Sequence, residues 1–506
     1  MFRQSHHPKH ARTWVLVTAI LGSSLVFIEG SVVNLALPAL QAQMHAASTD
    51  LQWVVNAYML MLGAFMLIGG SLGDRFGMRR VFILGSLIFC IGATACGFAP
   101  SLPLLIAARV LQGAGGALLV PACLALISLH YAGPARGRAI GVWAGASALT
   151  TSAGPLLGGA LVDQWGWHSV FLLLAPLALV GAALAWWRVP QDKSFTSTVG
   201  LDYWGAALLA AALSLFIYAL TGSGGTRWAL AAAALLSGAG FIWRELRAKA
   251  PMLPLGLFRS WPFSGANLMT LLLYGALSGG IYFLPFDFIQ VQGYTALQAG
   301  AAFLPFAAIL GFGSAFAASL IRRFDPRWVL SLGPCVTALG FLLLAVPGLQ
   351  ADYFTGFLPG IVVMGIGMTV SVTPLTTVVM ESLSAQQAGI ASGVNNTASR
   401  LAGVLSVAGM TALAVGLFGP ALAHGLQSAG VPGPLAEQLQ AGAGRLAELT
   451  PPQGTSPALK ETVRHAVGLA YVHTFRWIMG CCALAAALGG VVAWFSLAKL
   501  PARRRD

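Results

Sequence analysis

A short charged stretch separates two long apolar runs, and it reads Gly70-Ser-Leu-Gly-Asp74-Arg75-Phe-Gly77-Met-Arg79-Arg80. The runs lie at about 51–71 and 81–98. Each is long enough to cross a membrane as a helix, because about 20 apolar residues span the hydrocarbon core. The few residues between them allow only a tight turn, in which the glycines let the two backbones lie close together. Arginines gather in loops on the cytoplasmic side, so the stretch predicts two membrane helices joined by a cytoplasmic turn, whether or not Asp74 has a role of its own.

The composition of the whole chain is that of an integral membrane protein. Of its 506 residues, 57% are hydrophobic and only 8% are charged, whereas soluble domains carry about 25% charged residues. The net charge of +13 could indicate a nucleic-acid partner. Most of the basic residues fall on one side of the predicted membrane, however, which is the bias of a protein with many spans. We therefore expect a lipid bilayer and no nucleic acid as the partner.

The apolar runs predict an all-α polytopic membrane protein with fourteen transmembrane helices. An even number of spans places both termini on one side, in agreement with the basic tails. A faint repeat relates residues 71–85 to residues 319–333, after the second helix of each half. It predicts two six-helix bundles with a binding site at their interface.

The expected domains follow from these runs and from the polar segments between them. We expect a cytoplasmic tail at 1–12, a first bundle at 13–190, a linker at 191–261 with two additional helices at about 203–221 and 228–246, a second bundle at 262–498 with a long external loop at about 418–466, and a cytoplasmic basic tail at 499–506.

Four motifs, in chain order, resemble a known family. The turn resembles the signature loop of the major facilitator superfamily, G-x-L-x-D-R-x-G-x-[RK]-[RK]. Three further segments resemble the fourteen-span drug:proton antiporter branch of that superfamily. They are Glu29-Gly-Ser-Val-Val-Asn34 in the first span, Arg109-Val-Leu-Gln112-Gly113-Ala-Gly115 in the fourth, and Thr150-Thr-Ser-Ala-Gly154-Pro155-Leu-Leu-Gly158-Gly159 in the fifth.

The match to these motifs has three departures. Glu29 stands where the branch has Asp, Ser31 stands where it has Thr, and Thr150 stands where it has Gly. The resemblance implies the major facilitator fold with two extra central helices, alternating access, and export of small amphipathic compounds in exchange for protons. It also implies that the turn around Asp74 controls the conformational change. A proton-coupled or facilitative transporter of a metabolite with the same fold is the alternative.

Glu29 and Arg109 are the candidates for proton coupling. An ionisable group inside a span is costly and is by default a functional hypothesis. Arginine keeps its proton, so Arg109 needs a partner, and Glu29 is the nearest candidate because the first and fourth helices are neighbours in the implied fold. The other interpretations are a structural ion pair that never titrates and, for Arg109 and the Gly154–Gly159 motif, helix packing.

Further polar and aromatic side chains in the spans are candidates for a substrate path. Asp287 could be a second acidic site that favours a cationic substrate, or it could lie at the water interface. Arg400 could pair with Glu381 or bind carbonyl groups, with a gating or a structural role. The candidates for lining the path are Asn34, Gln52, Asn56, Tyr58, Gln112, Tyr274, Asp287, Gln290, Asn395 and Asn396.

Other chemistries find no support in the sequence. No lysine follows a glycine, so a Walker A motif and an ATP-driven pump are excluded. The six cysteines lack metal-ligand spacing, and no catalytic cluster is present. We expect no enzyme activity, no metal and no cofactor besides protons, in a monomer of the bacterial inner (plasma) membrane with both termini cytoplasmic. The resemblance leaves open a periplasmic adaptor and an outer-membrane channel as partners of the export.

Overall fold

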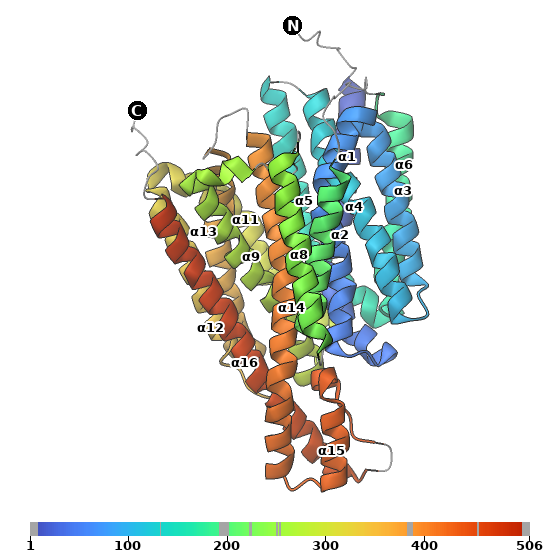
Figure 1. Ribbon diagram of the computed structural model, residues 1–506, viewed down its shortest axis with the longest axis vertical. Helices are drawn as coiled ribbons and strands as arrows, with labels where there is room; N and C mark the ends of the chain where they lie inside the picture. The colour runs from blue at the N-terminus through green and yellow to red at the C-terminus, as the bar shows by residue number, and fades with distance from the viewer. Residues whose placement is uncertain are drawn as a thin grey trace.

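The chain folds into two bundles of long helices (Figure 1). The computed structural model describes residues 9–131, 133–191, 202–221, 225–248, 251, 255–381, 388–452 and 455–497, apart from some side chains in these ranges, Asp74 and Glu381 among them. The expected tail at 499–506 and most of the tail at 1–12 lie outside the described residues. The prediction of an all-α protein is confirmed, since the described residues form helices and no strand.

The first bundle consists of α1 (Lys9–Met44), α2 (Ser48–Phe76), α3 (Met78–Gly97), α4 (Leu102–His130), α5 (Gly133–Trp165) and α6 (His168–Arg188). Within it, α1 packs against α4, α5 and α6, while α4 also packs against α2 and α3. The turn between α2 and α3 is a single residue, Gly77, with a φ of 93°. This φ disfavours any side chain, which explains the glycine at this place.

The second bundle repeats this arrangement. It consists of α9 (Trp261–Phe286), the π-turn η2 (Asp287–Val291), α10 (Ala296–Ala302), α11 (Leu304–Arg323), α12 (Pro326–Leu344), η3 (Tyr353–Phe357), α13 (Leu358–Glu381), α14 (Ala388–Ser428) and α16 (Pro457–Ser496). Here α9 packs against α14 and α16, and α12 packs against α13 and α16. The break between α10 and α11 lies just before Pro305, which lacks the N–H that a continuous helix would use.

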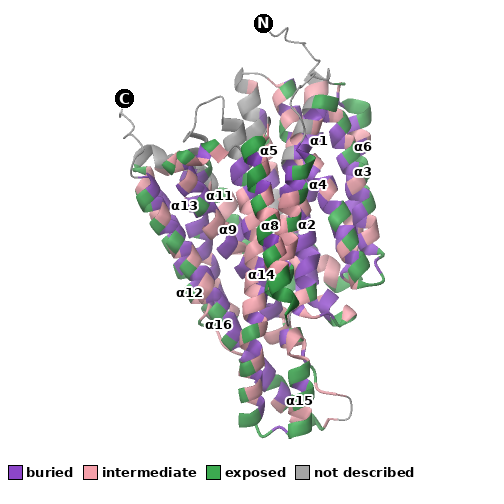
Figure 2. Ribbon diagram, viewed as in Figure 1, coloured by how far each residue is buried: buried purple, intermediate pink, exposed green. Residues whose placement is uncertain are grey.

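The two extra helices lie outside the seam between the bundles. They are α7 (Tyr203–Thr221) and α8 (Thr226–Arg247), followed by the short helix η1 (Leu255–Arg259). Helix α7 packs against α2 of the first bundle and α14 of the second, and α8 packs on α7. Figure 2 shows that α8 carries mostly exposed and half-buried residues. The pair therefore lies on the surface of the molecule, where α7 covers the contact between α2 and α14.

The number of membrane spans stays partly a prediction. Twelve helices in the described part are long and apolar enough to cross a membrane by length and composition. The long helices α2 and α5 are not among these twelve, so the structure supports the count of fourteen only approximately. The described helices otherwise begin and end close to the expected runs, and most of them are longer.

The prediction of a long loop at 418–466 is wrong. Helices α14 and α16 run on beyond the bundles, and α15 (Gly433–Ala441) and η5 (Ala443–Glu448) follow α14 and precede α16 in the chain (Figure 1). We call residues 418–466 the extension. Its many alanines favour helix, and Pro434 and Pro457 lie in the first turn of a helix, where the missing N–H costs little. The same residue types are also common in loops, which explains the error.

Candidate functional site

A buried ion pair joins α1 and α4. The Glu29 side chain is fully buried, and Arg109 is 1% exposed. Arg109 Nη1 donates to Glu29 Oε1 and to Gln112 Oε1, the latter at 2.7 Å, while its Nε donates to the Val54 carbonyl oxygen at 2.6 Å. The structure therefore brings together the two residues that the sequence paired, and it gives the guanidinium several acceptors.

Helix α2 supplies a polar wall beside this pair. The ring centroid of Tyr58 lies 4.4 Å from Arg109 Cζ, and the buried Tyr58 hydroxyl has no hydrogen-bond partner among the described residues. Gln52 and Asn56 are fully buried six and two residues before Tyr58 along α2. The amide of Asn56 has no hydrogen-bond partner among the described residues. Buried polar groups without partners are rare in proteins, so their presence here favours a functional site over simple packing.

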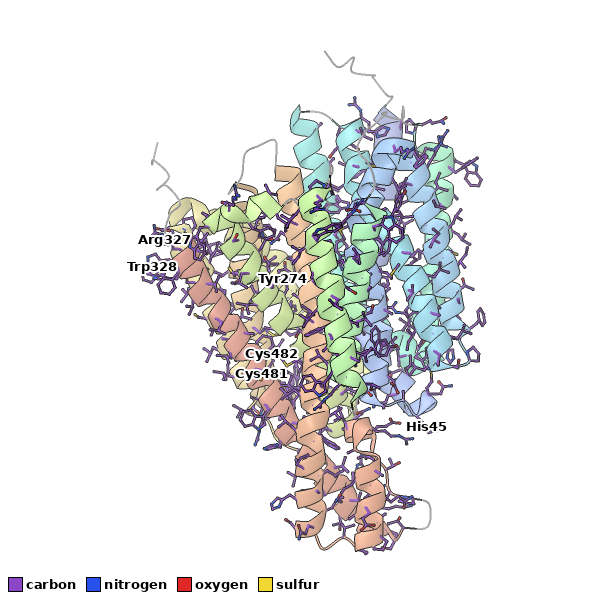
Figure 3. All side chains as sticks on the ribbon, viewed as in Figure 1. His45, Tyr274, Arg327, Trp328, Cys481 and Cys482 are labelled. Atoms are coloured by element: carbon purple, nitrogen blue, oxygen red, sulfur yellow. The ribbon has the colours of Figure 1, made fainter. Side chains whose placement is uncertain are left out.

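The second bundle adds a further cation. Arg400 of α14 packs against α2, with Nη1 3.9 Å from Met59 Sδ. Its charge acts on Glu29 and Tyr58 of the first bundle and on Tyr274 of α9. Figure 3 shows Tyr274 about halfway along α9. We call Glu29, Tyr58, Arg109, Tyr274 and Arg400 the charge cluster.

The structure does not test the expected pairing of Arg400 with Glu381. The side chain of Glu381 lies outside the described residues, so this pairing stays a prediction. The sequence analysis did not connect Arg400 with Glu29. No local motif links α14 to α1, because their proximity depends on how the two bundles pack.

An apolar cavity of about 320 Å³ lies between the bundles. Its walls come from α1 and α5 on one side and from α9, α11 and Phe303, which precedes α11, on the other. The Asn34 amide donates to the Gly30 carbonyl oxygen at 3.4 Å and is the polar side chain of the described lining. The residues that define the cavity best are Phe27, Asn34, Pro155, Ile281, Phe303 and Phe306.

The two bundles are closed against each other at the end opposite to where α1 begins and α16 ends. A Cβ added to Gly159 of α5 would collide with the Ala296 carbonyl oxygen, and one added to Gly300 would collide with the Pro155 carbonyl oxygen. Gln290 Nε2 donates to Gln41 Oε1 at 3.1 Å across the same boundary. The glycines of the fifth-span motif therefore lie where the bundles touch, which we call the closed end.

Asp163 is a residue at the closed end that the sequence analysis missed. Its carboxylate accepts the backbone N–H groups of Ala296 at 2.9 Å and Leu297 at 2.7 Å, and so caps α10 from the other bundle. Carboxylates stabilise the first turn of a helix. The position of Asp163, four residues after Gly159, was the available signal.

The remaining motif glycines pack α5 against its neighbours. A Cβ on Gly158 would lie 2.7 Å from Val32 Cγ1 of α1. Gly154 is buried one turn before it. The motif therefore serves close packing on the α1 side as well as at the closed end, in line with one of the two interpretations from the sequence.

Asp287 does not lie at the water interface, so that interpretation is wrong. Its side chain is only 2% exposed and accepts a hydrogen bond from Gln292 Nε2 at 3.3 Å. Gln292 also bonds the backbone of Gly348 and Ala351 at 3.0 Å each. Asp287 is thus held within the second bundle and is not part of the charge cluster.

Three other candidates also lie apart from the cluster. Asn395 Nδ2 donates to Thr270 Oγ1 at 2.6 Å within the second bundle. Asn396 is exposed on α14. Gln290 belongs to the closed end, so the structure gathers only part of the expected substrate-lining set in one place.

The turn motif lies at the opposite end of the first bundle. Arg79 Nε donates to the Ala185 carbonyl oxygen at 2.9 Å and Arg79 also bonds the Trp186 carbonyl, which ties α3 to the end of α6. Arg75 and Arg80 are exposed. A Cβ added to Gly70 would lie 3.8 Å from Pro121 Cβ, which is an ordinary van der Waals contact. The Asp74 side chain lies outside the described residues, so its role stays a prediction.

The sequence is similar to bacterial resistance and export proteins. It is 31% identical over 492 residues to the tetracenomycin C resistance and export protein of Streptomyces glaucescens, covering 95% of this chain and 90% of that protein. It is 33% identical over 433 residues to the puromycin resistance protein pur8 of Streptomyces alboniger, covering 83% and 86%. It is 31% identical over 404 residues to the multidrug efflux pump LfrA of Mycolicibacterium smegmatis, covering 78% and 80%.

Solved transporters share the fold at low sequence identity. A bacterial homolog of the human lysosomal transporter Spinster, in an inward-facing and occupied conformation, superposes with a TM-score of 0.67 at 18% identity over 97% of each chain. A D-xylose-proton symporter gives a TM-score of 0.59 at 14% identity over 95% of this chain and 97% of that one. At these identities the likeness shows the fold alone.

The family follows from the sequence pattern, the relatives and the fold together. The pattern of the Major Facilitator Superfamily matches residues 19–407, which is more than half of the chain. The resemblance noted in the motifs is thereby confirmed, and the family and its fold are those of transporters rather than enzymes. The chain belongs to the major facilitator superfamily.

Proposed function

We propose that this protein exports small amphipathic compounds across the bacterial inner membrane in exchange for protons, by alternating access. The observation that carries the proposal is the burial of Glu29 in an ion pair with Arg109 of its own bundle, where the charge of Arg400 of the other bundle also acts on it. The proton affinity of an acid at such a place depends on the relative position of the two bundles. The names of the similar resistance and export proteins support the direction of transport.

The charge cluster links protonation to movement. When Glu29 is ionised, it binds Arg109 and is attracted to Arg400. A proton on Glu29 removes both attractions, and the pull that Arg400 exerts across the bundle interface is then lost. Any rocking that moves α14 away from α1 changes the affinity of Glu29 for a proton, because binding and conformation are linked through the same free energy.

The driving force for export comes from proton entry. Each elementary charge that crosses the membrane releases about 2.3 kcal/mol per 100 mV. Substrate binding in the apolar cavity and proton binding on Glu29 use neighbouring walls of one interface, since Gly30 lines the cavity next to Glu29. Each therefore favours a particular arrangement of the bundles, which is the requirement for exchange.

The orientation in the membrane follows from the charge bias of the loops. With both termini cytoplasmic, the closed end faces outward. The extension then projects to the outer side, where it could contact a periplasmic adaptor. We expect a monomer to be sufficient for the exchange, with protons as the coupling ion.

The test is proton flux in proteoliposomes under an imposed pH gradient, with compounds added one at a time to the wild type and to Glu29→Gln. We expect proton movement triggered by a substrate, and its loss in the variant. Movement of substrate without protons would exclude antiport. Unchanged proton movement in Glu29→Gln would place the coupling elsewhere in the chain.

A further inference from the structure

The helices that wall the cavity carry few acids, and all of them are engaged elsewhere. In the sequence of α1, α5, α9, η2, α10 and α11 the acids are Glu29, Asp163 and Asp287. Glu29 is bound by Arg109, Asp163 caps α10, and Asp287 accepts from Gln292. None of the three is among the residues that line the cavity. A positively charged ligand would therefore meet no free carboxylate there.

Positive charge lies in excess behind one wall of the cavity. The charge cluster holds Arg109 and Arg400 against the single acid Glu29. Gly30 belongs to the cavity wall, and a Cβ on it would lie 3.8 Å from Met59 Cε. The sulfur of the same Met59 contacts Arg400, so one methionine separates this guanidinium from the wall. A proton on Glu29 would raise the excess further, so a cation would be repelled in both protonation states.

The lining fits flat aromatic molecules. Phe27, Phe303 and Phe306 come from both bundles, and aromatic rings prefer stacked or edge-on contacts with other rings. A volume of about 320 Å³ lies at the lower end of the range of small-molecule sites. The Asn34 amide offers a donor and an acceptor, which suits a carbonyl or hydroxyl group on the ring system.

We propose that this cavity binds aromatic compounds that carry no positive charge and rejects cations of the same shape. The inference rests on the proposed export function, because it assigns the substrate class of that same site. It also departs from the idea that Asp287 favours a cationic substrate, since Asp287 is occupied within the second bundle.

A pair of fluorescent tricyclic probes tests the charge preference. Acridone is neutral and 10-methylacridinium has a fixed positive charge, while the two share the same ring skeleton. Binding is measured by equilibrium dialysis of the full chain in nanodiscs, with empty nanodiscs as the control for partition into lipid. We expect acridone to bind at least tenfold more tightly. Equal or tighter binding of 10-methylacridinium, or no binding of either probe, would overturn the proposal.

Two variants locate the cause of the preference. Asn34→Asp adds a carboxylate to the cavity and should reduce the difference between the probes to less than threefold. Gln43→Glu adds the same charge to α1 outside the cavity, keeps an acceptor for Trp167 Nε1, and should leave the difference unchanged. Arg400→Gln removes the excess charge and should reduce the difference without any new acid. An unchanged preference in both Asn34→Asp and Arg400→Gln would overturn the electrostatic explanation.

Transport of the same probes separates this inference from the proposed function. Proton-driven movement of 10-methylacridinium at the rate of acridone would overturn the charge preference and leave export intact. Tight binding of acridone in the wild type, with no proton-driven movement of either probe, would support the charge preference and overturn the exchange mechanism.

Discussion

Glu29 and Asp287 are buried carboxylates in different bundles, and their surroundings differ in kind. Glu29 binds the Arg109 guanidinium of its own bundle, and the charge of Arg400 in the opposite bundle acts on it without an ion-pair contact. Asp287 is held by Gln292, which is itself fixed to the backbone of Gly348 and Ala351 in the same bundle. Movement between the bundles changes the surroundings of Glu29 and leaves those of Asp287 unchanged. Burial alone therefore does not identify a coupling residue, whereas an electrostatic interaction with the other bundle does.

The largest effect is expected from removing the partner of Glu29. Arg109→Gln leaves a buried carboxylate without its ion pair, and breaking such pairs typically costs about 3–5 kcal/mol. The measurement is the free energy of unfolding in detergent by thermal or denaturant titration. The double variant Glu29→Gln/Arg109→Gln should recover much of the loss, because no unpaired charge is then buried.

Arg476→Gln is a matched control for this loss. Arg476 bonds the carbonyl oxygens of Ala345 and Val346 at 3.1 and 3.2 Å, and these contacts are exposed. We expect its replacement to cost about 1 kcal/mol or less, as for other exposed polar contacts. An equal loss in the two single variants would show that Arg109 has no special electrostatic role.

The two carboxylates should separate most clearly in transport. Glu29→Gln should lower substrate-driven proton flux by about a hundredfold or more, within the range for loss of a positioned acid or base. Asp287→Asn keeps an acceptor for Gln292 and should stay within about threefold of the wild type. Equal loss in both variants, at equal amounts of folded protein, would remove the distinction drawn between the two sites.

The sequence could predict the parts of the site that depend on one helix at a time. Glu29, Arg109 and the fifth-span glycines were found because a charge or a close contact inside an apolar run is visible locally. The pairing of Glu29 with Arg109 came from the implied fold. The effect of Arg400 on Glu29 could not be predicted, because it depends on the packing of α14 against α2.

The fold was predictable to a similar depth. Apolar runs gave the helices and the two bundles, since about 20 apolar residues suffice for a span. The prediction of a loop for the extension was wrong, because alanine and proline are common both at helix starts and in loops. The hydropathy of 418–466 does not distinguish a helix outside the membrane from a loop. Asp163 was missed because its role is to cap α10, which lies more than a hundred residues away in the chain.

A smaller effect is expected at the closed end. Asp163→Ala removes two hydrogen bonds to the first turn of α10, whose N-cap Thr295 stays in place, and a loss of this kind costs about 1 kcal/mol. The closed arrangement should become about fivefold less favoured relative to the open one. In a cysteine-free background with Asn34→Cys, an impermeant maleimide added on the side of the closed end should react correspondingly faster.

Asp50→Ala is the control for this labelling experiment. Asp50 is an exposed acid in the first turn of α2 at the same end of the molecule. Its loss should leave the labelling rate of the cavity unchanged, because no contact between the bundles is removed. Identical rates in the Asp163→Ala variant and the wild type would mean that the cap does not hold the bundles together.

The smallest effect concerns a third carboxylate, Glu448 of the extension. Burial raises its pKa above the ordinary value, against the opposing effect of Arg445. A raised pKa means that the folded extension binds the proton more tightly than the unfolded chain. The stability of the extension is therefore greatest below the ordinary pKa of a glutamate and falls as the pH rises through the raised value.

Glu448→Gln should remove this pH dependence of the stability. The measurement is limited proteolysis of the extension between pH 4 and 8, about the range where such a shift acts. Glu437→Gln, which changes an exposed acid on α15, should keep it. A pH profile that is the same in all three proteins would show that burial of Glu448 does not affect the extension. Unlike Glu29, Glu448 has no cation from the opposite bundle among its described electrostatic neighbours, so its titration should alter the local stability of the extension and leave proton exchange intact.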